Sequence, residues 1–156
     1  MKYAIGVGSN RGERKEFIAR AASMLDDGLH LIAAAPLYTT QAVGGPLGQG
    51  AYVNTAWLIE SELGPHQLLH RLQVIETALG RFRTVPWGSR TMDLDLLLRE
   101  DGLILQSRVL TIPHPLMHLR AFVVAPLAQI AGAWRHPLSQ CTVAELALAT
   151  ARLAPS

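Results

Sequence analysis

The sequence predicts an α+β sandwich in which helices cover a single sheet. Strand-like and helix-like segments alternate along the chain, but without the strict period of a doubly wound fold. The 156 residues are 49% hydrophobic and 17% charged, a balance that supports one hydrophobic core. No internal repeat, linker or low-complexity tail divides the sequence. We therefore expect residues 1–156 to form a single domain.

The expected strands are short apolar runs bounded by turn signals. They lie at 3–7, 31–38, 52–59 and 92–98, with a short extended segment at 110–115. The run at 31–38 is apolar throughout, so we expect it to be well buried.

Helical spacing of apolar residues predicts four helices. They lie at 13–25, 65–79, 121–130 and 143–151. Pro65 in the first turn and Gly80 just past the end delimit the second helix. Thr142 and Glu145 predict a capping box at the start of the last.

Two segments, 39–50 and 80–91, follow neither period. The first contains four glycines, one proline and no charge, so it can bury little apolar surface. We expect both segments to be mobile loops.

Charge and cysteine content restrict the classes of function. A net charge of +2 is modest for a nucleic-acid protein, which usually carries a dense basic stripe. The basic residues are mostly arginines, which suit bidentate phosphate contacts. No apolar run approaches the roughly 20 residues that span a bilayer. Cys141 is the only cysteine, which excludes an internal disulfide and fits a cytoplasmic protein.

The strongest local signal is the pair Asp93 and Asp95 in an otherwise apolar strand. Residues two apart share a face of a strand, so both carboxylates project together. Their repulsion, roughly 1 kcal/mol or more where water is partly excluded, favours a bound cation. Oxygen ligands in an incomplete cage indicate Mg²⁺ shared with substrate phosphates. The alternative is a pair of solvated carboxylates at a strand end.

Basic residues flank this pair in the sequence. Arg81, Arg83 and Arg90 lie in the loop before it, together with Trp87. Guanidinium groups beside a metal–carboxylate site are suited to clamping a polyphosphate. The alternative is a surface loop whose arginines pair with acids such as Glu76.

A second group of polar residues surrounds His114. Pro113 and Pro115 stiffen the backbone on both sides of this histidine, and Arg120 follows. A histidine held in this way can donate to a phosphate oxygen, although a purely structural histidine would fit as well.

Together these segments resemble the 6-hydroxymethyl-7,8-dihydropterin pyrophosphokinases of folate biosynthesis. The resemblance covers the chain to about residue 130, and its most specific block is Trp-Gly-x-Arg-Thr-x-Asp-Leu-Asp. The matching segments, in order, are Gly8-Ser9-Asn10, Tyr38-x-Thr40-x-x-Val43-Gly44, Tyr52-Val53-Asn54, Gln73-x-x-Glu76, Gly80-Arg81-Phe82-Arg83, the block 87–95, and 111–114 through Arg120-Ala121-Phe122.

The resemblance implies a ferredoxin-like α+β fold with the active site across one face of the sheet. It implies transfer of pyrophosphate from ATP, as co-substrate, to the hydroxymethyl group of the pterin, releasing AMP. Two Mg²⁺ ions would be held by Asp93 and Asp95, which would act in catalysis with Arg81 and Arg90.

The resemblance also assigns binding residues and partners. The ATP-binding residues would be Gln73, Glu76, Arg81, Arg83, Trp87, Arg90, Leu96, Thr111, His114 and Arg120. The pterin would be stacked between Tyr52 and Phe122 and read by Thr40, Val43 and Asn54. The segments 43–50 and 81–91 would close over both substrates as lids. We expect a monomer that binds neither nucleic acid nor membranes.

Five residues depart from the family pattern: Ala42, Pro86, Val109, Leu116 and Leu119. They keep open a catalytically weak pterin- or nucleotide-binding paralogue, or an enzyme for a modified pterin. A metal-dependent nuclease or nucleotidyltransferase would need a continuous basic groove, which the modest charge does not favour. Glycosyl transfer would need a separate sugar-nucleotide domain, for which the chain has no room.

Overall fold

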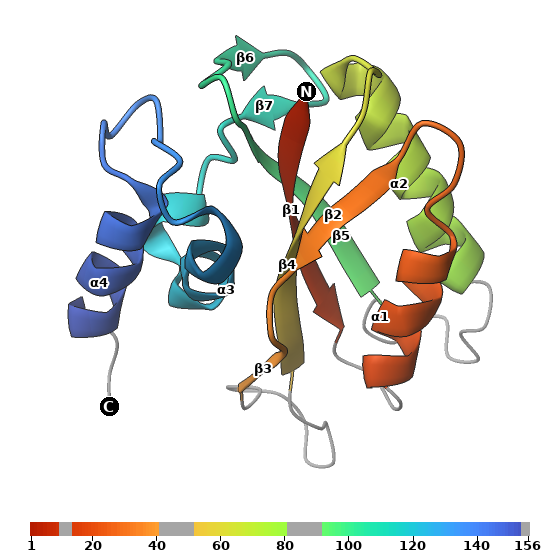
Figure 1. The fold of residues 1–156 in the computed structure, drawn as a ribbon, viewed down its shortest axis with the longest axis horizontal. Helices are drawn as coiled ribbons and strands as arrows, with labels where there is room; N and C mark the ends of the chain where they lie inside the picture. The colour runs from red at the N-terminus through yellow and green to blue at the C-terminus, as the bar shows by residue number, and fades with distance from the viewer. Residues whose placement is uncertain (10–13, 41–51, 81–91, 154–156) are drawn as a thin grey trace.

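The protein folds around an antiparallel sheet with helices on both faces (Figure 1). The computed structural model describes residues 1–9, 14–40, 52–80 and 92–153. Its elements are, in order, β1 Lys2–Ser9, α1 Arg14–Ser23, β2 His30–Ala34, β3 Tyr38–Thr40, β4 Tyr52–Glu60, α2 Pro65–Gly80, β5 Met92–Arg99, β6 Leu105–Gln106, β7 Thr111–Ile112, the 3-10 turn η1 Met117–Leu119, α3 Ala121–Ala131 and α4 Val143–Leu153.

The strand order is β2-β4-β1-β5, with β3 pairing onto β4. Each pairing is antiparallel. The helix α1 makes β1 and β2 parallel, and α2 makes β4 and β5 parallel, but the strands of each parallel pair are separated by another strand. This order, with a helix between β1 and β2 and another between β4 and β5, is the ferredoxin-like arrangement. The predicted fold class is confirmed.

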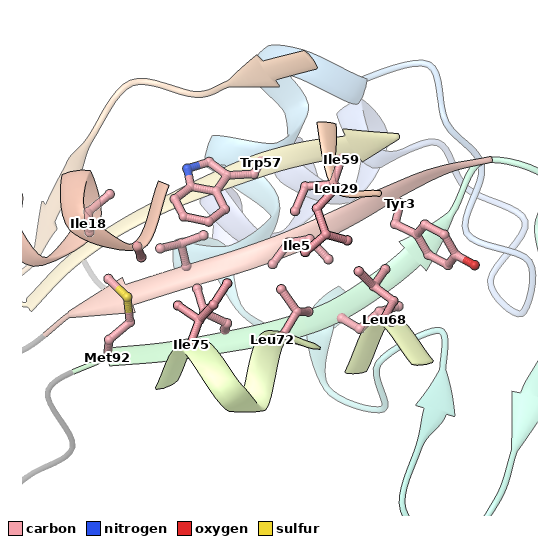
Figure 2. Packing of buried hydrophobic residues seen from close by; sticks show 14 of the residues in the cluster. Tyr3, Ile5, Ile18, Leu29, Trp57, Ile59, Leu68, Leu72, Ile75 and Met92 are labelled. Atoms are coloured by element: carbon pink, nitrogen blue, oxygen red, sulfur yellow. The ribbon is translucent and has the colours of Figure 1, made fainter. Parts of the chain in front are cut away.

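The sheet is buried on both faces. On one face Ile5, Trp57, Leu72 and Ile75 belong to a cluster between the sheet and α1 and α2 (Figure 2). On the other, Leu58, Leu97, Val124 and Leu127 belong to a second cluster under α3 and α4. Because both faces are covered, seven consecutive residues of β4, 53–59, are buried.

Several of the predicted strands and helices match those of the structure closely. The predicted burial of residues 31–38 was wrong. This run forms two strands, β2 and β3, and most of β2 is exposed. In the described part of the chain β2 pairs only with β4, at the edge of the sheet, so solvent reaches it. Gly80, predicted just past the second helix, is its last residue.

The structure also contains elements that the sequence analysis did not predict. Strand β6 is one of them, and it forms a two-residue ladder with β7, which lies within the predicted extended segment 110–115 and packs beside β5. The turn η1, which precedes α3, is another. The Ile112–Pro113 peptide bond is cis. None of the helices in the described ranges is long and apolar enough to cross a membrane.

The capping box of the last helix is confirmed. The Thr142 N–H donates to Glu145 Oε1 at 2.8 Å, and the Glu145 N–H donates to Thr142 Oγ1 at 3.1 Å. The connection that leads into this helix contains the buried His136, whose Nδ1 accepts a hydrogen bond from the Ser139 N–H at 3.0 Å. Its ring lies 5.3 Å from that of His118, measured between centroids.

Candidate active site

Strand β5 directs two carboxylates to the face of the sheet that α3 covers. Met92, Leu94 and Leu96 are buried in the cluster on the α1–α2 face. Asp93 and Asp95 alternate with them, so they project to the opposite face. Asp93 is half-buried and Asp95 is exposed. The predicted sharing of one face is thus present.

A tyrosine from β4 reaches across the sheet to the first of these carboxylates. The Tyr52 hydroxyl donates to Asp93 Oδ2 at 3.1 Å. Burial, followed by the charge of Asp93 and this hydrogen bond, raises the pKa of Tyr52 far above its usual value. The charge of Asp95 adds to the shift and that of Arg120 opposes it. The hydroxyl therefore stays protonated and serves as a donor.

His114 is held next to the same carboxylates by its backbone and its ring. Its N–H donates to Leu97 O on β5 at 2.8 Å, and its Nδ1 accepts from the Leu116 N–H at 3.2 Å. Burial lowers the pKa of His114; the Asp95 carboxylate partly opposes this and the Arg120 charge adds to it. A neutral imidazole that accepts at Nδ1 carries its proton at Nε2. His114 can therefore donate a hydrogen bond through Nε2.

The start of α3 adds a cation and an aromatic ring. Arg120 precedes the helix and Phe122 lies in its first turn, with the Arg120 Cζ atom 5.8 Å from the centroid of the Phe122 ring. Phe122 is 42% exposed. Since Arg120 influences the pKa values of both Tyr52 and His114, it lies within electrostatic range of both residues.

Asn54 contributes a buried amide to this face. It is only 5% exposed, and within the described residues its Nδ2 has no hydrogen-bond partner. It pairs in register with Gly8 of β1, which in turn pairs with Asp93 of β5. Residues directly opposite one another share a face, so this amide lies on the same face as the carboxylates. A buried donor without an acceptor is costly and indicates a place for a polar ligand.

The outer edge of β5 forms the other border of the site. Glu76 Oε2 accepts the Leu94 N–H at 2.8 Å, so this N–H points away from β1. The backbone of Leu96, two residues on, faces the same way. Thr111 lies in β7, which packs beside β5, and Gln73 is exposed on α2.

A family model described as "7,8-dihydro-6-hydroxymethylpterin-pyrophosphokinase (HPPK)" matches residues 4–132. The chain belongs to this family. A Haemophilus influenzae 2-amino-4-hydroxy-6-hydroxymethyldihydropteridine pyrophosphokinase is 42% identical over 139 residues, covering 87% of this chain and 85% of the relative. A Bacillus subtilis protein of the same name is 40% identical over 130 residues, covering 81% and 75%.

A solved HPPK-DHPS structure from Plasmodium falciparum has a TM-score of 0.69 at 13% identity. The match covers 95% of this chain but only 43% of that longer chain. At this low identity the likeness shows the fold alone.

Other predicted HPPK site residues lie outside the described residues. These are Val43, Arg81, Arg83, Trp87 and Arg90, together with the departures Ala42 and Pro86 and both predicted lids. Thr40 ends β3. Among the remaining departures from the family pattern, Val109 is 71% exposed, and Leu116 and Leu119 are also exposed.

Sequence reasoning missed the contact between Tyr52 and Asp93 and the role of Gly8 beneath it. A carbon atom placed at the Cβ position of Gly8 would lie 2.7 Å from both Cε1 and the hydroxyl oxygen of Tyr52. The available signal was Gly6-Val7-Gly8 inside a strand, because glycine in a strand marks a bulge or a close approach of another group.

Proposed function

We propose that this protein transfers the pyrophosphate group of ATP to the hydroxymethyl oxygen of 6-hydroxymethyl-7,8-dihydropterin, in folate biosynthesis. Family membership supports the reaction class, as do the names of the relatives. The structural observation that best supports the proposal is that Tyr52, His114 and Arg120 lie near Asp93 and Asp95 on one face of the sheet.

The donor set fits magnesium. Within the described residues, no group of three or more His, Cys, Asp or Glu side chains could hold a metal. Two carboxylates alone do not make an all-protein cage, but Mg²⁺ is usually held by one or two carboxylates with substrate phosphates and water. We propose that Asp93 and Asp95 hold two Mg²⁺ ions with ATP. When bound, these ions would neutralise charge on the phosphates.

The reaction needs positioning and donors more than a dedicated base. The pterin hydroxyl oxygen forms a bond to the β-phosphorus of ATP, and the bond from that phosphorus to the AMP oxygen breaks. AMP departs with the bonding electron pair, and the hydroxyl proton is released. We propose that His114 Nε2–H and the Arg120 guanidinium donate to phosphate oxygens. We propose the same role for Arg81, Arg83 and Arg90, with Trp87 beside them.

The pterin would lie between the rings of Tyr52 and Phe122. Each good stacking partner contributes roughly 1–3 kcal/mol, by analogy with nucleic-acid bases. The buried amide of Asn54 would donate to the heterocycle through Nδ2 and accept through Oδ1. We propose that Thr40 and the backbone near Val43 also contact the hydrogen-bonding edge of the pterin.

The adenine would lie along the outer edge of β5. The backbone of Leu96 faces that edge, and β7 with Thr111 runs beside it. Gln73 and Glu76 on α2 would border the nucleotide. Glu76 also accepts a backbone hydrogen bond from β5, so we infer that it supports the strand from which the metal-binding residues project.

The decisive experiment is incubation of the protein with ATP, Mg²⁺ and 6-hydroxymethyl-7,8-dihydropterin, followed by detection of AMP. AMP formation that depends on both the pterin and Mg²⁺ supports the proposal. ADP as product, or AMP without pterin, would refute it. Calorimetric pterin binding with only background AMP release would instead support the binding paralogue. A single domain over 1–156, the monomeric state, the cytoplasmic location and the lack of nucleic-acid binding stay predictions.

A further inference from the structure

Gly8 occupies a position where any added side chain would force the Tyr52 ring to move. It lies on β1 between Asn54 of β4 and Asp93 of β5. Tyr52 belongs to β4, so its side chain must cross β1 to donate to Asp93, and it crosses at Gly8. A Cβ atom there would lie 2.7 Å from the Tyr52 hydroxyl oxygen and from Cε1.

The same distances show how the tyrosine ring stands on the strand. The Cζ atom is bonded to both Cε1 and the hydroxyl oxygen, yet it lies farther from the added carbon than either of them, at 3.1 Å. The ring therefore turns an edge, rather than a face, toward Gly8. Because the contact with β1 uses an edge, it leaves the faces of the ring for stacking with a flat ligand.

The hydroxyl end of the ring is held independently. Its hydrogen bond to Asp93 Oδ2, at 3.1 Å, fixes the position of the hydroxyl oxygen, and the edge contact at Gly8 opposes rotation about the long axis of the ring. A backbone contact at one edge and a polar contact at one end together define the plane of the ring. A stacking surface fixed before binding avoids the cost of ordering it later.

We propose that Gly8 is a positioning residue for the pterin, because it lets Tyr52 stand edge-on over β1 with its hydroxyl on Asp93. The inference rests on the proposed function. Ordinary van der Waals contact begins at 3.4 Å, so a methyl group at residue 8 would displace the ring edge by at least about 0.7 Å. The displacement would change the ring plane that meets the pterin and pull the hydroxyl from Asp93.

Gly6 provides a matched control on the same strand. It is two residues away and faces the same side, but the atoms nearest to an added Cβ would belong to the flexible side chain of Leu97, at 3.3 Å from Cδ1. Leu97 belongs to the cluster under α3 and α4. Gly6→Ala therefore carries the same loss of backbone freedom as Gly8→Ala without touching Tyr52.

The test measures the Kd of 6-hydroxymethylpterin by pterin fluorescence, with Mg²⁺ and a non-hydrolysable ATP analogue present. The parent protein is compared with its variants. We expect Gly8→Ala to raise the Kd of the pterin about tenfold or more, the loss of one good stacking partner. The Kd of the ATP analogue should change less than about threefold, and Gly6→Ala should leave both constants within about twofold. Tyr52→Phe keeps the ring but loses the hydroxyl, so we expect a smaller rise of about three- to tenfold.

A double-mutant cycle shows whether the effect acts through the ring. Gly8→Ala should lower the unfolding midpoint in the parent protein and much less in a Tyr52→Ala background, where the clashing ring is absent. Unchanged pterin affinity in Gly8→Ala, equal weakening of pterin and nucleotide, or an equal drop of the midpoint in both backgrounds would each overturn the inference. Failure of the parent protein to bind pterin at all would refute the proposed function instead.

Discussion

Replacing Asp95 by asparagine tests the metal-binding role at constant shape. At about 4 Å and an effective dielectric constant near 20, which suits a partly exposed site, one pair of unit charges is worth about 4 kcal/mol. Losing that attraction in the transition state corresponds to roughly a thousandfold in rate. We therefore expect Asp95→Asn to reduce kcat, measured by AMP release at saturating Mg²⁺, by about three orders of magnitude.

The same substitution should leave the fold intact. Asp95 is exposed on β5, whereas its neighbours Leu94 and Leu96 carry the packing. We expect the free energy of unfolding to change by less than about 1 kcal/mol. Asp101→Asn is the control, since Asp101 lies beyond the other end of β5 and accepts two hydrogen bonds from Arg99 at 2.9 Å; it should retain full activity. If Asp95→Asn kept more than about a tenth of the parent kcat, the metal-binding role would be refuted.

Three further predictions concern stability. Burial lowers the pKa of His136, so the unfolded state binds the proton more readily than the folded state. The contribution of His136 to the free energy of unfolding should be fully present above about pH 6.5 and should fall toward pH 5. The dependence of this free energy on pH, measured by urea unfolding, should be weaker in His136→Asn. Thr142→Ala should lower the free energy of unfolding by about 1 kcal/mol, because the cap of α4 is lost. The rate of AMP release should not change, which would show that the effect stays local to the helix. Leu72→Ala, at a fully buried position, should cost about 2–5 kcal/mol by denaturant unfolding, whereas a similar cost for the half-exposed Val74→Ala would contradict this packing argument.

Local patterns predicted the elements whose ends carry their own signals. The alternation of leucine and aspartate in β5 specified both the strand and the face of its carboxylates. Thr142 and Glu145 lie three apart, and they do form the predicted capping box. These features depend on residues close in sequence, so a single sequence contains them.

Features that depend on distant segments were not available from the sequence. The apolar run 31–38 was expected to be well buried, but only the strand order shows that β2 lies at an edge. The contact of Tyr52 with Asp93 spans 41 residues and depends on a glycine in a third strand. Glu76 was expected beside a nucleotide, but its hydrogen bond to the Leu94 N–H depends on the packing of α2 against β5.

The two-sided burial of the sheet separates stability from chemistry at the scale of a single residue. Along β5, Met92 and Leu94 pack under α1 and α2, and each is followed by an aspartate that projects to the face that α3 covers. Substitutions that tighten the packing beneath α1 and α2 should therefore raise stability without changing turnover. Changes at Asp93 and Asp95, one position along the strand, should alter turnover at nearly constant folding free energy, because neither carboxylate is fully buried.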